Sequence, residues 1–286
     1  MTRRGVYFLA NDGILDIAIA FLNSFRCYNP SIELCLIPFS DDIERLRLLG
    51  PQYRFSIWRD VAALQWCDGI GRLFHGCTVG QYRKLAMWEG VFDEFVYIDC
   101  DTVVLHNIEF AFHYLARCEY LASHSDIPDI RRWVWKTSVY ASGALSSKQI
   151  SYAANTGFVA SKRMCMSRAH VEARLDGALA LAPHMELFCC EQPLINYLIV
   201  TSGQRYTSLY AIARESGGWF GIPRELWAGD PSFVVREGRV VRPKTAVLMV
   251  HWAGEWEIAR REGRQIPHHD LWSYYRHLSP PLMSNY

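Results

Sequence analysis

The sequence lacks the marks of several protein classes. Its nine cysteines are scattered over 286 residues without C-x-x-C spacing, so neither a zinc ribbon nor a secreted disulfide framework is predicted. No window holds the ~18 apolar residues that a membrane span requires, and Asn11 and Asp12 interrupt the apolar stretch near the N-terminus. That stretch is too short for a signal peptide. We therefore expect a cytoplasmic protein with at most weak membrane contact.

An excess of charge of one sign is also missing. The chain has 30 Lys and Arg against 29 Asp and Glu, for a net charge of +1, so no nucleic-acid partner is predicted. Any binding site for an anion must then be local. The length suits one large domain, and no repeat or linker divides it. We predict one domain over residues 1–267 and a C-terminal tail helix over 268–286.

Apolar runs alternate with segments of helical periodicity. The runs that predict strands cover residues 5–10, 33–39, 53–58, 95–98, 119–123, 155–161 and 245–254. Helices are predicted after Gly13 and over 41–50, 81–89 and 191–201. This alternation is typical of an α/β protein with a mostly parallel, Rossmann-like sheet flanked by helices. Residues 125–150 show no clear periodicity and predict a loop that covers the site.

Two carboxylates follow the central strand, in the sequence Asp99-Cys100-Asp101. Ligands bind at the carboxyl ends of strands in such sheets. The first and third side chains of a D-x-D sequence point the same way, and their oxygens suit Mg²⁺ or Mn²⁺. Alternatively, one aspartate caps a turn and the other is solvated. The apolar residues that follow, 102–105, favour the ion site because they exclude a surface loop.

Residues 82–112 resemble the central segment of the glycogenin-like, family 8 glycosyltransferases, which have the GT-A fold. Further segments similar to this family follow in its order, at residues 8–12, 155–161, 190–196 and 250–256. The resemblance implies transfer of a hexose, with retention, from a nucleotide sugar to a glycan or other hydroxyl acceptor. A UDP-sugar is the expected donor, Mn²⁺ or Mg²⁺ the expected cofactor, and a lipid-linked or small-molecule acceptor is an alternative.

The resemblance also implies a metal site. Asp99, Asp101 and His251 would be the ligands, brought to one sheet edge, with Asp99 also touching the ribose of the donor. Cys100 and Gly254 would lie beside the donor. A lone histidine after an apolar strand is more often structural, but the D-x-D sequence and the following glycine favour the ligand role.

The nucleotide would lie against the end of the first strand, at Leu9, Ala10, Asn11 and Asp12. The alternative role of Asn11 and Asp12 is to form the turn, and the two roles are compatible. Lys84 would reach the sugar or the phosphates of the donor. Its alternative is a solvated charge on a helix.

Glu191 and Gln192 stand where the family has Asp-Gln, and Asn155 stands in its Asn-Ser-Gly strand. Glu191 would keep a role near the anomeric carbon or merely cap the helix, and Gln192, Asn155 and Lys84 are the other candidate catalytic residues. Covalent attack by Glu191 and front-face entry of the acceptor are both open, with the front-face route preferred.

Other positions depart from the family. Ile14 replaces the aromatic residue that stacks on the base, and Glu257 replaces the lysine that meets the phosphates. Arg260, Arg261 and Arg264 are alternative phosphate contacts.

Two other functions fit parts of the sequence. "DCDTV" also matches the nucleophile motif of haloacid-dehalogenase-like phosphatases, with Asp99 as nucleophile, although that motif normally opens its domain. A non-catalytic module that binds sugar nucleotides is the second alternative.

The remaining segments concern the acceptor and the tail. Aromatic and basic residues at 129–138 and 215–227 suit an acceptor sugar or a buried core equally. In the tail, one predicted apolar helix face docks on the domain in preference to a membrane; it consists of Leu271, Trp272, Tyr275 and Leu278.

Overall fold

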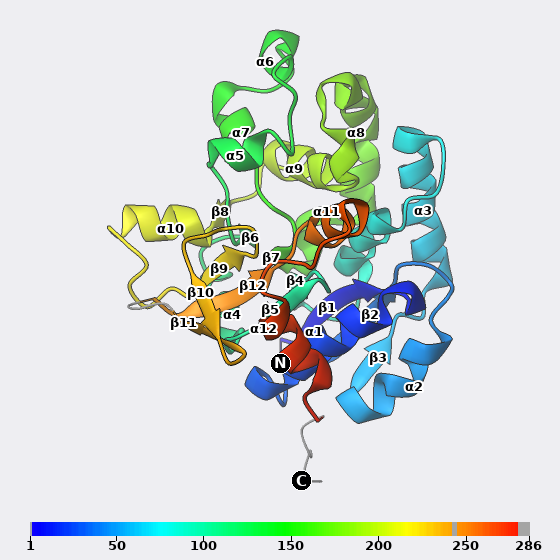
Figure 1. Ribbon diagram of the computed structural model, residues 1–286. Helices are drawn as coiled ribbons and strands as arrows, with labels where there is room; N and C mark the ends of the chain where they lie inside the picture. The colour runs from blue at the N-terminus through cyan, green and yellow to red at the C-terminus, as the bar shows by residue number, and fades with distance from the viewer. Residues whose placement is uncertain (1, 242–244, 280–286) are drawn as a thin grey trace.

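The computed structural model describes residues 2–241 and 245–279 (Figure 1). The strands are β1 (Arg4–Ala10), β2 (Leu34–Pro38), β3 (Phe55–Ile57), β4 (Glu94–Ile98), β5 (Thr102–Val104), β6 (Tyr120–Ala122), β7 (Phe158–Lys162), β8 (Tyr206–Ser208), β9 (Arg224–Trp227), β10 (Val234–Arg236), β11 (Arg239–Val241) and β12 (Val247–His251). The helices are α1 (Leu15–Tyr28), α2 (Glu44–Tyr53), α3 (Val61–His75), α4 (Glu109–Tyr114), α5 (Pro128–Arg131), α6 (Val139–Ser142), α7 (Ser147–Tyr152), α8 (Arg168–Leu181), α9 (Gln192–Thr201), α10 (Leu209–Glu215), α11 (Glu255–Glu262) and α12 (His269–His277). Short 3₁₀ helices are η1 (Asp12–Ile14), η2 (Gly80–Glu89), η3 (Arg163–Met166), η4 (Ala182–His184) and η5 (Leu187–Cys189).

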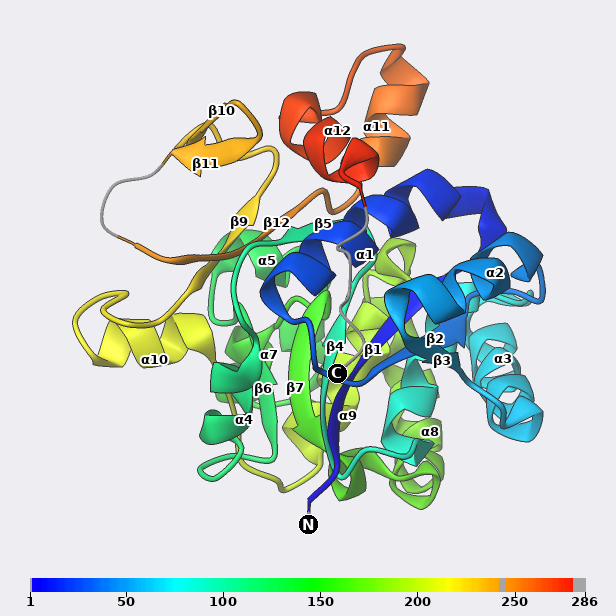
Figure 2. The same ribbon diagram turned by 90° about the horizontal axis from the view of Figure 1, so that it is seen from below.

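The central sheet has the order β3-β2-β1-β4-β7-β6-β8. Strand β1 pairs in parallel with β2 and β4, whereas β7 runs antiparallel to β4. Helices cover both faces of the sheet (Figures 1 and 2), and two large apolar clusters fill its sides. This confirms the predicted α/β class and mostly parallel sheet. Because β7 is antiparallel, its first residues lie beside the last residues of β4, where the D-x-D sequence begins.

A second sheet, of order β5-β12-β9, begins where the chain leaves the first one. Asp99, Cys100 and Asp101 connect β4 to β5, and β5 pairs antiparallel with β12 so that Thr102 faces His251. The strand predicted over 245–254 therefore exists and ends at His251, but it does not share the central sheet with the first aspartate. The expectation of a single sheet edge was wrong, because the chain changes sheets at the D-x-D sequence.

Helix α2 spans Glu44–Tyr53 rather than the predicted 41–50. Its free N–H groups are capped from a distant turn: the carboxylate of Asp12 accepts hydrogen bonds from the backbone N–H groups of Arg45 (2.7 Å) and Leu46 (2.9 Å). Such a cap comes from tertiary folding, so the local sequence of the helix does not reveal it.

Several other segments differ from the prediction. The helix predicted over 81–89 exists as the 3₁₀ helix η2, and η2 is almost wholly buried. Its first residue, Gly80, packs so closely on the carbonyl of Phe39 that a side chain would not fit. Helices α3 and α8 were not predicted.

The segment 125–150 is not an irregular loop. It contains the short helices α5, α6 and α7, and Val134, Trp135 and Ile150 are buried in the main core. The stretch 215–227 likewise contains strand β9. Whether the first segment moves over the site stays a prediction.

The C-terminal helix α12 packs on α1, near the opposite end of the chain (Figures 1 and 2). Leu271 and Tyr275 are buried, and Trp272 and Leu278 pack on the same apolar cluster. The side-chain amide of Asn23 donates hydrogen bonds to the carbonyls of Tyr275 (2.8 Å) and Leu278 (3.0 Å). The predicted apolar face thus docks on the protein itself.

The division into a domain over 1–267 and a tail over 268–286 stays a prediction, and residues 280–286 lie outside the described part. Within the described ranges, no helix is both long and apolar enough to cross a membrane.

We expect Leu271→Ala to lower the free energy of unfolding by about 2 to 5 kcal/mol, because it leaves a cavity between α12 and α1. Urea denaturation monitored by circular dichroism measures this change. Leu48→Ala makes the same substitution on α2 at a side chain that is 79% exposed, and it should change stability by less than about 0.5 kcal/mol. Equal effects of the two variants would contradict the docking.

Candidate active site

The connection between β4 and β5 brings Asp99 and Asp101 to His251. The His251 Nε2 lies 3.3 Å from an Asp101 oxygen and 4.0 Å from an Asp99 oxygen. One ligand atom of each residue lies within 4.8 Å of the others. The antiparallel register explains this arrangement: the backbone N–H of Trp252 bonds to the carbonyl of Asp101 at 2.9 Å, which fixes the two segments side by side.

These side chains fit a divalent cation. Two carboxylates and one imidazole provide oxygen and nitrogen donors, a combination that suits Mn²⁺ better than the all-oxygen preference of Mg²⁺. Asp99 and Asp101 keep 28% and 29% of their side-chain surface exposed. A ligand can therefore reach them from the solvent, while His251 approaches from the buried side.

The imidazole is held among negative charges. Burial lowers the pKa of His251, but the charge and hydrogen bonds of Asp101 and Glu225 outweigh burial and raise this pKa well above its usual value. Burial raises the pKa of Asp101, and the proximity of His251 reverses the effect and lowers it. A proton and a divalent cation satisfy the same carboxylates, so they compete for this position.

Gly157 closes one side of the cluster. Its carbonyl accepts a hydrogen bond from the Asp99 N–H at 2.8 Å. A Cβ atom at this position would collide with the ring of His251 and approach oxygens of Asp99 and Asn155. A glycine is needed here because neighbouring side chains approach its Cα closely, not because of an unusual backbone angle.

Lys84 lies beside the cluster in a buried position, with only 4% of its side chain exposed. Its Nζ is 2.6 Å from a Glu191 oxygen and 3.2 Å from an Asp99 oxygen, and it also lies 4.7 Å from the centre of the Tyr97 ring. Burial lowers the pKa of Lys84, but Asp99 and Glu191 outweigh it and raise the pKa above its usual value. The alternative of a solvated helix charge is therefore wrong.

Glu191 precedes helix α9 and is buried. The hydroxyl of Thr156 donates a hydrogen bond to the same oxygen that Lys84 contacts, at 3.3 Å. Burial raises the pKa of Glu191, against the opposing effect of Lys84. Lys84 thus joins Glu191 to Asp99 of the Asp99, Asp101 and His251 cluster.

Gln192 and Asn155 belong to the same group of side chains. The Gln192 Oε1 accepts hydrogen bonds from the side chain of Asn155 (3.4 Å) and the N–H of Thr156 (3.2 Å), and its Nε2 donates to the Trp133 carbonyl (3.1 Å). Strand β7 begins at Phe158, later than predicted, so Asn155 lies in the preceding loop. Its Oδ1 accepts a hydrogen bond from the Gly157 N–H at 2.8 Å.

The residues predicted to contact the nucleotide have structural partners. Leu9 and Ala10 are buried in β1. The Asn11 side chain donates to the Ser40 hydroxyl at 3.0 Å, and Asp12 caps α2. The turn role of these two residues is thus present, and their contact with a nucleotide stays a prediction.

Two other predicted positions flank the cluster. The Cys100 side chain is buried in the apolar core. Gly254 precedes α11 with a φ of 73°, which favours glycine. On α11 Glu257 is exposed, and Arg264 is engaged by Glu255 at 3.2 Å.

Sequence reasoning missed Tyr97, Thr156 and Glu225. The Tyr97 hydroxyl donates to Asp99 at 2.7 Å, and two-residue periodicity along β4 could have indicated it, since residues two apart share a face. Glu225 lies 2.7 Å from the Nδ1 of His251. No local signal marks Glu225, because its partner comes from another strand.

No family model and no curated protein sequence matches the chain. Solved structures do match. The bifunctional glycosyltransferase WbbM shares 14% identity at a TM-score of 0.61, covering 98% of this chain and 50% of WbbM. The glycosyltransferase GlyE of Streptococcus pneumoniae gives 14% identity, a TM-score of 0.52 and coverages of 99% and 62%. The galactosyltransferase LgtC, in complex with donor and acceptor sugar analogues, shares 14% identity at a TM-score of 0.51. The match covers 87% of this chain and 87% of LgtC.

The chain thus spans about half the length of WbbM and less than two thirds of GlyE. At these identities the similarity concerns the fold: the chain has the GT-A fold of glycosyltransferases.

We expect Gly157→Ala to weaken Mn²⁺ binding about tenfold or more, because the new methyl group displaces His251 or Asp99. Loss of the groups that orient metal ligands lowers metal affinity about 10- to 100-fold. Isothermal titration with MnCl₂ measures the affinity. Gly69→Ala is the matched control, since a Cβ there meets nothing within 4 Å. Unchanged affinity in Gly157→Ala would place the ion elsewhere.

Proposed function

We propose that the protein is a metal-dependent glycosyltransferase that moves a hexose from a nucleotide sugar to a hydroxyl acceptor with retention. One observation carries the proposal: the cluster of Asp99, Asp101 and His251, which could hold a metal ion, is joined through Lys84 to the buried Glu191. It lies where strands of a GT-A fold end, which is the edge where ligands bind in such sheets.

Departure of the nucleoside diphosphate requires stabilisation of its developing negative charge. A bound Mn²⁺ or Mg²⁺, held by Asp99, Asp101 and His251, would supply that charge neutralisation. Lys84 adds a second positive charge, and its burial strengthens the interaction with a phosphate. The contacts of its Nζ with Asp99 and Glu191 hold the ammonium in place before a donor arrives.

The sugar itself develops positive charge as the bond to the leaving group breaks. Glu191, with Gln192 and Asn155 beside it, provides oxygens that would stabilise this charge. Because Lys84 and Thr156 already hold the carboxylate of Glu191, it is a weaker nucleophile than a free one. This supports the front-face route over covalent attack.

A UDP-sugar remains the expected donor. Asn11 and the backbone of Leu9 and Ala10 are the proposed contacts of its base and ribose, since Asp12 is occupied at α2. On α11, Arg260 and Arg261 are exposed and are the remaining candidates for phosphate contacts.

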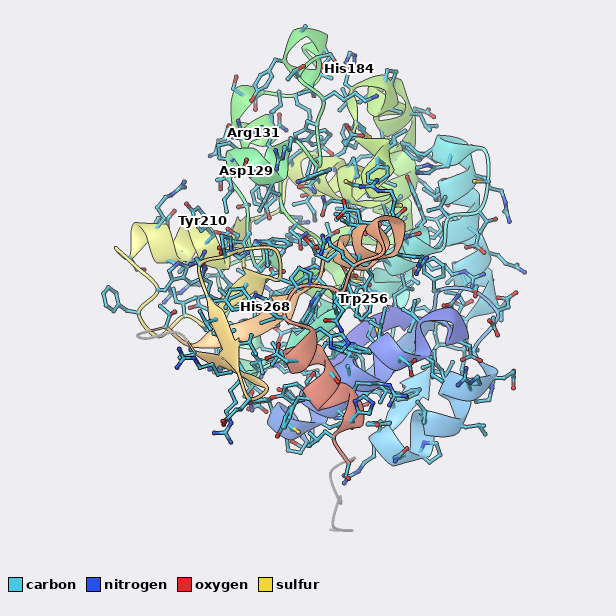
Figure 3. The ribbon with its side chains drawn as sticks, viewed as in Figure 1. Asp129, Arg131, His184, Tyr210, Trp256 and His268 are labelled. Carbon is cyan, nitrogen blue, oxygen red and sulfur yellow. The ribbon has the colours of Figure 1, made fainter. Side chains whose placement is uncertain are left out.

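The expected acceptor is a glycan or a lipid-linked sugar. We propose that it binds near Trp133. Trp133 is 46% exposed, the Arg132 guanidinium lies 5.2 Å from the centre of its ring, and its carbonyl accepts a hydrogen bond from the Gln192 side chain. A partly exposed tryptophan beside a cation suits contact with a sugar ring. Figure 3 shows Asp129 and Arg131 on the adjacent helix α5, with Trp256 on α11.

The alternatives receive less support. In a phosphatase Asp99 would have to attack phosphorus, but its Oδ1 is held by both Tyr97 and Lys84, and the imidazole of His251 lies 4.0 Å from its Oδ2. A binding module would not require a buried lysine and carboxylate beside the sugar. The cytoplasm stays the expected location, from the cysteine pattern of the sequence.

We expect a screen of nucleotide sugars to yield release of the nucleoside diphosphate with Mn²⁺ or Mg²⁺ and none in excess EDTA. Asp101→Ala should abolish turnover while preserving the far-UV circular dichroism spectrum, because it removes a metal ligand. The anomeric configuration of the product, read by NMR, tests retention. Full activity in EDTA would refute the proposal, donor binding without turnover would favour a binding module, and hydrolysis of generic phosphate esters would favour a phosphatase.

We expect Lys84→Ala to lower kcat/KM by about 10²-fold or more, since a charge-assisted contact to a phosphate in a buried site is worth roughly 2 to 4 kcal/mol. Steady-state kinetics with the identified donor measure this change. Lys148→Ala, at an exposed position of α7, is the control and should change kcat/KM less than about twofold. A loss below threefold in Lys84→Ala would remove Lys84 from the proposed mechanism.

A further inference from the structure

We propose that Glu225 is the positioning residue for the metal site: it orients His251 so that its Nε2 faces the aspartates. The inference rests on the proposed metal-dependent function, and it assigns a role to a residue that lies outside the ligand set.

The first observation is the contact between Glu225 and the ring of His251. Glu225 lies on β9, which runs parallel to β12, and its side chain is 0% exposed. One carboxylate oxygen lies 2.7 Å from the His251 Nδ1. A carboxylate can only accept a hydrogen bond, so Nδ1 carries the hydrogen. The lone pair of a neutral ring is then on Nε2, on the side of Asp99 and Asp101.

The second observation is that the other carboxylate oxygen of Glu225 is also held. It accepts hydrogen bonds from His124 Nδ1, at 3.3 Å, and from the hydroxyl of Ser123. Both residues follow β6 of the central sheet, whereas Glu225 and His251 belong to the second sheet. The carboxylate is therefore fixed from both sheets and is kept from turning towards the ion as an additional ligand.

Aromatic rings enclose this cluster. The Trp227 ring stacks on His251 with centroids 5.3 Å apart and an interplanar angle of 26°. Trp227, Trp219 and Tyr210 surround His124 at 5.7 to 6.0 Å, and Figure 3 shows Tyr210 on α10. The rings limit rotation of the imidazole and exclude water, so the negative charge of Glu225 acts strongly on the His251 ring. A carboxylate partner of this kind makes a histidine a more basic ligand.

The cluster around Glu225 also contacts the backbone of Asn155, a residue proposed to lie near the donor sugar. The carbonyl of His124 accepts a hydrogen bond from the Asn155 N–H at 3.1 Å. Glu225 therefore stands between a metal ligand, His251, and the backbone that positions Asn155.

Mn²⁺ affinity of the full chain, measured without donor by electron paramagnetic resonance of free Mn²⁺, tests the inference. Glu225→Gln keeps the shape and the hydrogen-bond acceptor but removes the charge, and we expect about tenfold weaker binding or more, within the 10- to 100-fold range of such outer partners. Glu119→Gln is the matched control. Glu119 is paired with Arg205 at the other end of β6, and its loss should leave Mn²⁺ affinity unchanged.

A double-mutant cycle separates positioning from general stability. In a His251→Ala background, Glu225→Gln should change Mn²⁺ affinity less than about twofold, because Glu225 acts through the ring that is now absent. Equal losses with and without His251 would overturn the inference and leave Glu225 a structural residue. Wild-type affinity in Glu225→Gln, combined with weak binding in His251→Ala, would overturn it and leave the proposed function standing. No Mn²⁺ binding by the wild-type chain would refute both.

Discussion

The buried ammonium of Lys84 is the constraint on which the site depends. A lysine that is removed from water must have carboxylate partners, because an unpaired buried charge is very costly. Asp99 and Glu191 are those partners, and they come from the end of β4 and the start of α9. The pairing therefore fixes how far apart these elements lie. Any shift of η2, which carries Lys84, would separate a charge from its partner.

The site also depends on the junction of two sheets. The chain leaves the central sheet at Asp99, enters β5 of the second sheet at Thr102, and so meets His251 across an antiparallel pair. Ser123 and His124 of the central sheet contact Glu225 of the second. The ligand cluster is thus built where the two sheets are joined, which makes its geometry a property of the whole fold.

Charge is concentrated at this junction, although the chain is almost neutral. Asp99, Asp101, Glu191 and Glu225 gather around the cations of Lys84 and, when protonated, His251. An excess of carboxylates raises the local affinity for a divalent cation. A lysine beside this excess of carboxylates suits the proposed phosphate-bearing donor and its ion.

The sequence by itself determined the α/β class, the position of the D-x-D sequence after a central strand and the end of a buried strand at His251, because hydrophobic periodicity and turn residues are local signals. It also marked Lys84, Asn155, Glu191 and Gln192 through the resemblance. Only the tertiary structure decided that His251 belongs to a second sheet, that η2 is a buried 3₁₀ helix, that Asp12 caps α2, and that Glu225 contacts His251 and Tyr97 contacts Asp99. Each of these depends on a partner far away in the chain, and the pairing of distant residues is settled by packing and by the need to satisfy buried polar groups, which no local pattern records.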